Sequence, residues 1–492
     1  MNNSGVFLLI IIILIIGIVT FGIVSFSGEI DNSDKVMNGT FPEIKSSDRI
    51  IIISPHPDDG VLANSGIIKE ALRKNAEIKV VYMTVGDALD KDYLKLYLRS
   101  KNINNFKGSI GDIRHLEALN GLVKLGLNES NAVFLGYPDQ GLKSLFLSHW
   151  DYNNLLKKNS GSNQNDHSPY NFTFEKNAPY CGANVVKNLD QIFDDFNPNI
   201  LLMPDDGDDH PDHWSANAFI QYVALEKGFN GSIYHYLVHK GIWPTPGKYS
   251  PDDQLLPPFE VVQLDAIWLR LKLNNKDKKL KLEAINSHET QTFATKNYLQ
   301  SFDRVDEFFA IYPNIKVSKK EAYSISDGMP TSSFKDLTGE SINIMENHIH
   351  HYNRIALKRN VSRHDFFMQS LIYDVLDSAG LVKDGQNLYA VINSNKYNVN
   401  FNYIFYLYLY NGSDYRKLDI NVTNNTANYL YKSSDSILSS QKLEVEHANN
   451  LTSVKIPLSV IENTQNILMT VDEINGINSI VLDSTPLRVF QL

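Results

Sequence analysis

Cysteine is almost absent from this sequence, since Cys181 is the single cysteine among 492 residues. One cysteine excludes an internal disulfide and a cysteine-rich metal site. No activating motif surrounds Cys181, so we interpret it as a small buried apolar residue. An excess of basic residues is also missing, because the net charge is -10, which gives no support for nucleic-acid binding. The remaining composition is that of an ordinary globular protein, and its length predicts two domains.

Charged residues are missing from the start of the chain until Glu29. The run from Val6 to Phe26 is almost wholly Ile, Leu, Val, Phe and Gly, and about twenty apolar residues span a bilayer as a helix. A cleavable signal peptide is the alternative, but a basic n-region and a small-x-small cleavage site are both missing. We therefore predict an uncleaved transmembrane helix that anchors the protein.

The sequence contains few residues that indicate the orientation of this helix in the membrane. No Lys or Arg lies near either end, so the positive-inside rule has nothing to count. Acidic residues follow the helix, with only the α-amino group before it, and we expect a single-pass membrane protein whose body is extracytoplasmic. Asn-x-Ser/Thr sequons, several of which would arise by chance, point the same way at Asn38, Asn171, Asn230, Asn360, Asn411, Asn421 and Asn450.

Two polar clusters each follow a short apolar run. Ile51 to Asp59 is typical of a buried strand followed by one histidine and two carboxylates, and Asn199 to Met203 precedes the cluster from Asp209 to His213. Open α/β sheets place their ligands at the carboxyl ends of strands. Two histidines and one carboxylate, with a position left for water, form the composition of a hydrolytic zinc site. Two ordinary polar turns are the alternative, which the pairing of the clusters disfavours.

From Arg49 onward, short apolar runs alternate with amphipathic stretches, which predicts βαβ units and a parallel sheet. The predicted strands are Ile50 to Ile53, Ile78 to Thr84, Ala132 to Leu135, Ile200 to Met203 and Ser232 to Val238, and His239 follows the last of them. The predicted helices are Asn64 to Lys74, Gly111 to Leu125, Asn184 to Phe196, Trp214 to Glu226, Lys278 to Ser287 and Tyr298 to Phe309.

A series of motifs carries a resemblance over about Arg49 to Tyr312. They are His56-Pro57-Asp58-Asp59, Arg114, Glu117, Phe134 to Asp139, His210-Pro211-Asp212-His213, Lys281, Ala284, Gln291, Glu307 and Phe308. With these residues, the chain resembles the PIG-L/LmbE-like family of zinc-dependent N-acetylglucosaminyl de-N-acetylases. The resemblance implies a Rossmann-like, mostly parallel sheet flanked by helices, one catalytic Zn²⁺, and hydrolysis of the acetamide of an N-acetylglucosamine-type sugar.

The resemblance also implies roles for the motif residues. His56, Asp59 and His213 match the zinc ligands, and Asp58 matches the general base. His210 matches the electrophilic or acid group, oriented by Asp212. An aspartate beside a ligand can take a proton from water without spending its lone pairs on the metal. Either Asp58 or His210 could then protonate the leaving amine.

One position departs from the family pattern. Members often have Glu directly after the two aspartates, where this chain has Gly60. A carboxylate there would support the orientation of a ligand, so we expect its loss to act on ligand geometry or on the substrate.

The alternation of predicted strands and helices stops beyond Tyr312. Stretches Ser341 to Asn360 and Asp365 to Ser378 are typical of helices, and short β-rich runs between turns follow from Leu388, which predicts a β-sandwich. The predicted organisation is a transmembrane anchor at 1–28, a polar tether at 29–47, a catalytic domain at 48–315, a helical and irregular connector at 316–385 and an all-β, sandwich-like accessory domain at 386–492.

Three functions fit these observations. The first is a membrane-anchored zinc deacetylase that acts on an N-acetylglucosamine-type sugar in a glycan or glycolipid. The second is a zinc amidohydrolase that acts on another N-acyl conjugate. The third is a non-catalytic surface glycan-binding protein with a degenerate enzyme fold, for which Gly60 is the only argument. We favour the first, because a decayed site has no reason to keep all of its metal and acid/base positions.

Overall fold

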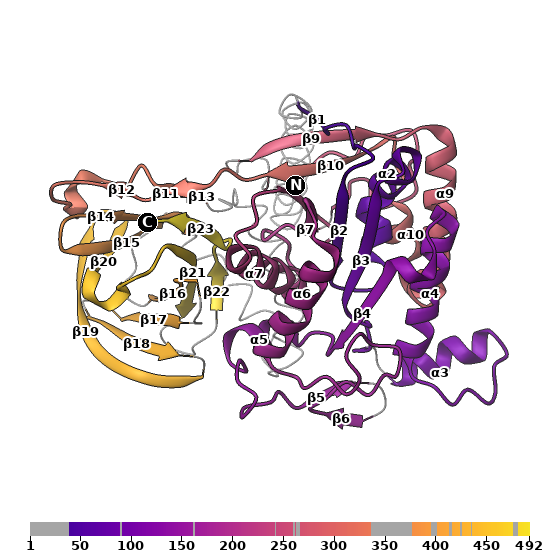
Figure 1. The fold of residues 1–492 in the computed structure, drawn as a ribbon, viewed down its shortest axis with the longest axis horizontal. Coiled ribbons are helices and arrows are strands. Elements are labelled where there is room, and N and C mark those ends of the chain that lie inside the picture. Colours follow the sequence, from indigo (N-terminus) through magenta and orange to yellow (C-terminus); the bar gives the residue numbers. More distant parts are fainter. Residues whose placement is uncertain are drawn as a thin grey trace, which may run out of the picture.

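The computed structural model describes most of the chain after residue 38, in two bodies that lie side by side (Figure 1). The predicted anchor lies outside the described residues. Within the described residues, no helix is long and apolar enough to cross a membrane. The described ranges are 39–88, 91–160, 163–241, 243–258, 261, 266–335, 376–394, 401–412, 416–423, 426–433, 435–475 and 481–492.

The first body is built on an eight-stranded sheet with the order β1-β9-β10-β8-β7-β2-β3-β4. Five neighbouring strands are parallel: β8 (Ser232–Tyr236), β7 (Ile200–Pro204), β2 (Arg49–Ser54), β3 (Glu77–Thr84) and β4 (Ala132–Tyr137). The parallel sheet is therefore confirmed. An antiparallel pair, β9 (Ile267–Lys272) and β10 (Asp306–Ile311), extends one edge, and β1 (Gly39–Thr40) pairs with β9. The chain order reverses between β2 and β7, where open α/β sheets form their ligand sites.

Helices cover both faces of this sheet. Strand β2 is apolar on both faces, because Ile50 and Ile52 join one core cluster whereas Ile51 and Ile53 join the other. This matches a buried parallel strand. The first face is covered by α2 (Asp59–Lys74), α4 (Ile110–Leu125), α9 (Asn275–Asn286) and α10 (Glu289–Gln300). The second is covered by α5 (Leu142–Leu147), α6 (Gly182–Phe196) and α7 (Pro211–Glu226). The short helix α3 (Lys91–Ser100) precedes α4.

Two sequence-based expectations in this body were wrong. The range Tyr298 to Phe309 is not one helix, because α10 ends at Gln300 and residues 306–311 form strand β10. The apolar residues of this strand form backbone hydrogen bonds with β9. This pairing joins segments that are distant in the sequence, so helical periodicity could not predict it. The prediction of a polar tether at 29–47 was also wrong over its described residues, since Phe41 and Ile44 are buried in the first core cluster.

The second body is β-rich, as predicted. Its thirteen described strands follow the path β11-β23-β21-β16-β17-β18-β19-β20-β15-β14-β12, with β13 on β14 and β22 on β21. The long strand β19 pairs with β18 on one side and β20 on the other, so that the sheet folds over one shared core. The strands are β11 (Ile315–Lys316), β12 (Ser318–Lys319), β13 (Ser333–Lys335), β14 (Leu376–Lys383), β15 (Asn387–Ser394), β16 (Phe401–Tyr410), β17 (Arg416–Thr423), β18 (Thr426–Ser433), β19 (Ser436–Ala448), β20 (Leu451–Pro457), β21 (Asn466–Asn475), β22 (Val481–Ser484) and β23 (Arg488–Gln491).

The boundary of the β-rich body also differs from the prediction. Strand β14 begins at Leu376, so the end of the predicted helix Asp365 to Ser378 is strand, and the domain starts before residue 386. Strands β11, β12 and β13 belong to the same sheet, although they precede residues 336–375. The predicted helix Ser341 to Asn360 lies outside the described residues.

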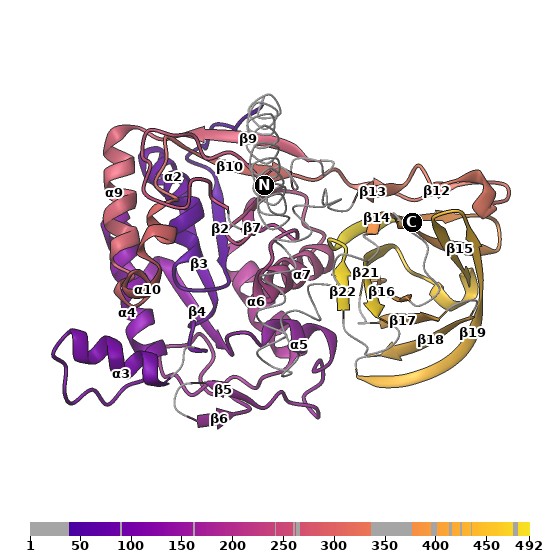
Figure 2. The same cartoon turned by 180° about the vertical axis from the view of Figure 1, so that it is seen from behind.

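The two bodies pack closely against each other. Tyr408, Tyr410 and Leu468 of the β-rich domain belong to the same apolar cluster as helices α5 and α7. The rings of Phe146 and Tyr408 lie 4.8 Å apart. Viewed from behind, the β-rich domain lies beside α7. Helices α4 and α9 lie at the opposite side of the first body, away from the β-rich domain (Figure 2).

Candidate metal centre

Three adjacent strands deliver the candidate residues to one edge of the sheet. His56 follows β2, and Asp59 is the first residue of α2. His210 caps the amino end of α7, and His213 lies in its first turn. Because β2, β7 and β8 are parallel neighbours, their carboxyl ends bring both motifs together.

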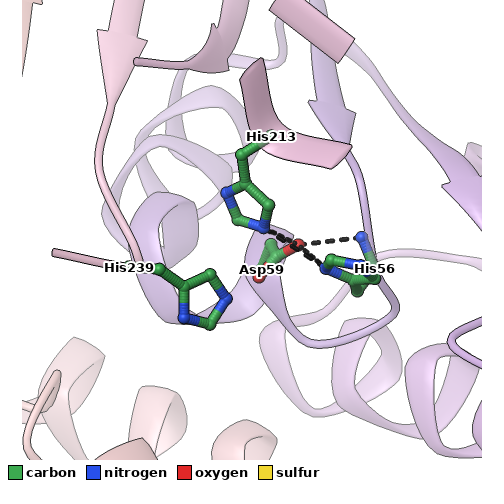
Figure 3. A group of neighbouring side chains, drawn as sticks. All are labelled: His56, Asp59, His213 and His239. Carbon is green, nitrogen blue, oxygen red and sulfur yellow. Dashed lines mark hydrogen bonds and ion pairs between the residues drawn. The ribbon is translucent and has the colours of Figure 1, made fainter. Parts of the chain in front are cut away.

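The three predicted ligands converge closely (Figure 3). His56 Nδ1 lies 3.1 Å from Asp59 Oδ2, and His213 Nε2 lies 3.0 Å from the same oxygen. The two nitrogens are 3.2 Å apart. One ion at about 2.0–2.2 Å from each atom can bridge donors at such separations, so the residues present fit zinc.

In His56 and His213, the ring nitrogen that does not face the Asp59 oxygen, here called the outer nitrogen, faces a carboxylate instead. His213 Nδ1 lies 3.0 Å from Asp208 Oδ2. His56 Nε2 lies 3.4 Å from Asp139 Oδ1 and 3.5 Å from Asp212 Oδ2. Burial alone would lower the pKa of His213, but Asp208 and Asp59 outweigh it and raise the pKa to about 9. Outer carboxylates of this kind fix the ring orientation of metal-binding histidines.

Asp58 lies beside the cluster and has a different partner. Arg114 Nη2 donates to Asp58 Oδ1 at 2.9 Å, and Nη1 donates to the carbonyl of Gly86 at 2.8 Å. Gly86 has φ +66 and packs against this guanidinium so closely that a Cβ would overlap it. The glycine at the end of β3 therefore makes room for Arg114, which holds the Asp58 carboxylate in place.

His210 has the opposite hydrogen-bond arrangement from His213. The backbone N–H of Asp212 donates to His210 Nδ1 at 3.1 Å, and the ring lies 4.5 Å from the His56 ring. Since Nδ1 accepts this bond, the proton of a neutral His210 ring is on Nε2. The carboxylate of Asp212 accepts from the backbone N–H groups of Gln140 and Leu142. Asp212 thus contacts the His210 ring through its backbone N–H and not through its carboxylate. The predicted roles of both residues stay predictions.

Three residues of this site received no role in the sequence analysis, although Asp139 ends one of the motifs that carry the resemblance. Asp139 and Asp208 approach the outer nitrogens of the ligands, and His239 joins His56, Asp59 and His213 in one group of ligand atoms within 4.8 Å of one another. Burial and the neighbouring His213 lower the pKa of His239 to about 4, so its imidazole is neutral. Its position directly after a predicted strand was the available signal.

Gly60 is held in a tight environment. Its backbone N–H donates to Ser54 Oγ at 2.9 Å. A Cβ at this position would lie 3.3 Å from both Ser54 Oγ and Val80 Cγ1. A glutamate would require these neighbours to move, so the departure from the family pattern matches the local packing.

The composition of this centre is that of a hydrolytic metal site: two histidines and an aspartate, a further carboxylate outside the ligand group, and a neighbouring histidine that can donate a hydrogen bond. Residues 51–224 match the family model described as PIG-L: GlcNAc-PI de-N-acetylase. The predicted resemblance to the PIG-L family is confirmed over these residues.

Curated relatives agree with this family. The chain is 28% identical over 232 residues to a 1D-myo-inositol 2-acetamido-2-deoxy-alpha-D-glucopyranoside deacetylase from Mycobacterium sp. (strain JLS). That match covers 46% of this chain and 63% of the relative. A deacetylase of the same name from Corynebacterium glutamicum (strain R) is 22% identical over 50% of this chain and 76% of that relative.

Solved deacetylase structures are also similar. An N,N'-diacetylchitobiose deacetylase from Pyrococcus horikoshii is 18% identical, with a TM-score of 0.32, over 53% of this chain and 83% of that chain. A deacetylase of teicoplanin biosynthesis is 16% identical, with a TM-score of 0.35, over 53% of this chain and 96% of that chain.

Proposed function

We propose that this protein is a zinc-dependent deacetylase that hydrolyses the N-acetyl group of an N-acetylglucosamine-type amino sugar in a glycan or glycolipid. The observation that carries the proposal is the convergence of His56, Asp59 and His213 beside Asp58, inside a PIG-L family domain. The relatives are named as deacetylases of an acetamido sugar linked to inositol, which supports the same substrate class.

His56, Asp59 and His213 would hold the zinc. When bound, zinc supplies Lewis-acid polarisation of the amide carbonyl and makes water a better nucleophile at neutral pH. The outer contacts of the ligands, with Asp208 on His213 and Asp139 on His56, keep the inner nitrogens turned towards the shared Asp59 oxygen. The protein therefore offers a preorganised donor set.

Asp58 would act as the general base. It takes a proton from the water molecule that attacks the amide carbonyl, which is a step that a positioned carboxylate typically accelerates by roughly 10²- to 10⁴-fold. Arg114 fixes one carboxylate oxygen at 2.9 Å, so that the other is available to the water. The same Asp58, once protonated, can return the proton to the leaving amine.

His210 would stabilise the developing oxyanion. Its Nδ1 accepts from the backbone N–H of Asp212, so the proton of the neutral ring is on Nε2. A fixed donor aimed at developing charge is worth about 10²- to 10³-fold in rate.

The proposal includes a membrane anchor at residues 6–26 and an extracytoplasmic catalytic domain. The apolar run before Glu29 and the sequons support it. Such an anchor would keep the catalytic domain close to a glycolipid or a surface glycan. Attachment of a reporter enzyme to the carboxyl end, assayed on intact cells, tests this orientation.

Amine release from N-acetylglucosamine and its short oligomers tests the activity. The full chain in detergent would be assayed with zinc, with chelator and as the Asp58→Asn variant, and N-acyl amino acids serve as comparison substrates. We expect zinc-dependent amine release from the sugars and a loss of about 10²- to 10⁴-fold in the variant. Release from N-acyl amino acids alone would contradict the substrate class, and absence of zinc binding would contradict the mechanism.

A further inference from the structure

His239 lies at the same edge of the sheet as the predicted ligands. It follows strand β8, which pairs with β7, and its backbone is tied to the loop that carries the second motif. The His239 N–H donates to Asp208 Oδ2 at 2.9 Å, and its carbonyl accepts from the N–H of Asp209 at 2.8 Å. Asp208 also contacts His213 Nδ1, so one carboxylate sets the positions of both histidines.

The tautomer of His239 follows from its hydrogen bonds. The hydroxyl of Tyr298 donates to the carbonyl of Val238 at 2.7 Å and lies 3.0 Å from His239 Nδ1. Because the hydroxyl hydrogen is used by the carbonyl, the tyrosine oxygen accepts from Nδ1–H. The Nε2 atom of His239 therefore keeps its lone pair, which is the form that binds a metal.

Three histidines in this centre share one arrangement of hydrogen-bond partners around the ring. His213 has a carboxylate at Nδ1, His56 has carboxylates at Nε2, and His239 has a tyrosine oxygen at Nδ1. In each, an oxygen acceptor faces one ring nitrogen, and the other nitrogen is left for the centre. Figure 3 shows one nitrogen of the His239 ring turned towards Asp59. His210 differs, because its Nδ1 accepts a backbone N–H.

We propose that His239 is a fourth protein ligand of the metal. Its ligand atom lies within 4.8 Å of those of His56, Asp59 and His213. Four protein ligands hold an ion more tightly than three, and zinc can take a fifth ligand during a reaction. The inference rests on the proposed function only in placing a metal at this centre.

Metal binding without substrate tests the proposal. Zinc dissociation constants of the full chain would be measured in detergent by competition with a chromophoric chelator, alongside the absorption spectrum of the Co²⁺-loaded protein. The variants are His239→Ala, His239→Gln and Tyr298→Phe. His447→Ala, on strand β19 of the β-rich domain, is the matched histidine control.

We expect His239→Ala to weaken zinc binding by about 100-fold or more, because outer partners alone account for roughly 10- to 100-fold. The Co²⁺ spectrum should change, and imidazole added to the solution should restore it. Tyr298→Phe should weaken binding by about tenfold, and His447→Ala should match the wild type.

Unchanged zinc affinity and an unchanged Co²⁺ spectrum in both folded His239 variants would overturn the inference, even if deacetylation were lost. The zinc-dependent function would then still stand. A wild-type protein that binds no metal would instead overturn the proposed function itself. Thermal unfolding of each variant separates loss of a ligand from loss of the fold.

Discussion

Two clusters of carboxylates and histidine lie near the ends of β7 and β8, and they differ in the origin of their positive charge. The metal centre consists of His56, Asp59, His213 and His239. The second, which we name the arginine cluster, consists of Asp205, Asp206 and His235 with Arg488 from strand β23. Both groups place possible ligand atoms within 4.8 Å of one another.

The arginine cluster contains its own cation. Arg488 forms an ion pair with Asp206, and its guanidinium carbon lies 3.8 Å from the centre of the Tyr312 ring. The Tyr312 hydroxyl donates to Asp205 Oδ2 at 2.7 Å. Burial and the positive charge of Arg488 lower the pKa of His235 to about 3, so this histidine stays neutral. The cluster joins the β-rich domain to the first body.

Beside the metal centre, Arg114 pairs with Asp58. In the described part of the chain, the ion pairs of Asp59 are with His56 and His213. Burial alone would raise the pKa of Asp59, but these two histidines outweigh it and hold the pKa well below its ordinary value. The comparison teaches that two groups of similar residues differ in their ion-pair partners, which are an arginine in one group and histidines in the other.

Removal of the built-in cation should have the largest effect on stability. Arg488→Met leaves Asp206 charged and buried, and breaking a buried pair costs about 3–5 kcal/mol. We expect the free energy of unfolding in urea to fall by that amount, and added zinc should not restore it. Lys455→Met is the control, because its pair with Glu444 is exposed and should be worth below about 1 kcal/mol. Equal losses in the two variants would contradict the distinction.

Chelation should act on the metal centre alone. At a zinc concentration of 100 times Kd, binding stabilises the folded state by about 2.7 kcal/mol. We expect a chelator to remove this increment in the wild type and equally in Arg488→Met, because the two clusters take different cations. A thermal unfolding series with and without chelator measures it. A chelator effect that disappears in Arg488→Met would show that the clusters are not independent.

The outer carboxylate Asp208 provides a smaller effect. Asp208→Asn keeps the shape but loses the charge that faces His213 Nδ1. Loss of an outer partner costs roughly 10- to 100-fold in metal affinity, which is about 1.4–2.7 kcal/mol. Isothermal titration with zinc would measure the change. Unaltered affinity would mean that the backbone alone fixes the His213 ring.

The pH dependence of stability should distinguish the arginine cluster. Burial and the neighbouring Asp206 raise the pKa of Asp205 to about 7. The folded state then binds more protons than the unfolded state between the ordinary carboxyl pKa and pH 7, so stability falls as pH rises through this window. The slope is at most about 1.4 kcal/mol per pH unit for one proton. Asp205→Asn should flatten this part of the curve, and an unchanged slope would assign it to another group.

Much of the metal centre could be predicted from the sequence, because its main parts are local. A run of β-branched residues predicts a buried strand, and the first polar residues after it must lie at the edge of the sheet. Thus the positions of His56, Asp59 and His213 near one another followed from two strand ends. The resemblance then suggested their roles.

Prediction was weaker where the partners come from distant elements. The prediction of a helix from Tyr298 to Phe309 missed the pairing of β10 with β9, and the predicted connector missed the pairing of β14 with β15. Strand and helix periodicities are hard to separate in short apolar runs, and long-range hydrogen bonds decide between them.

The sequence by itself determined which residue types follow each strand, because that relation spans only a few residues of backbone. Only the tertiary structure decided which ring nitrogens face one another and which carboxylates receive a protein cation. The order of β8, β7 and β2 brings His239 beside His213, and domain packing brings Arg488 onto Asp206 across 282 residues. Such contacts depend on strand order and on packing between domains, which no local pattern encodes.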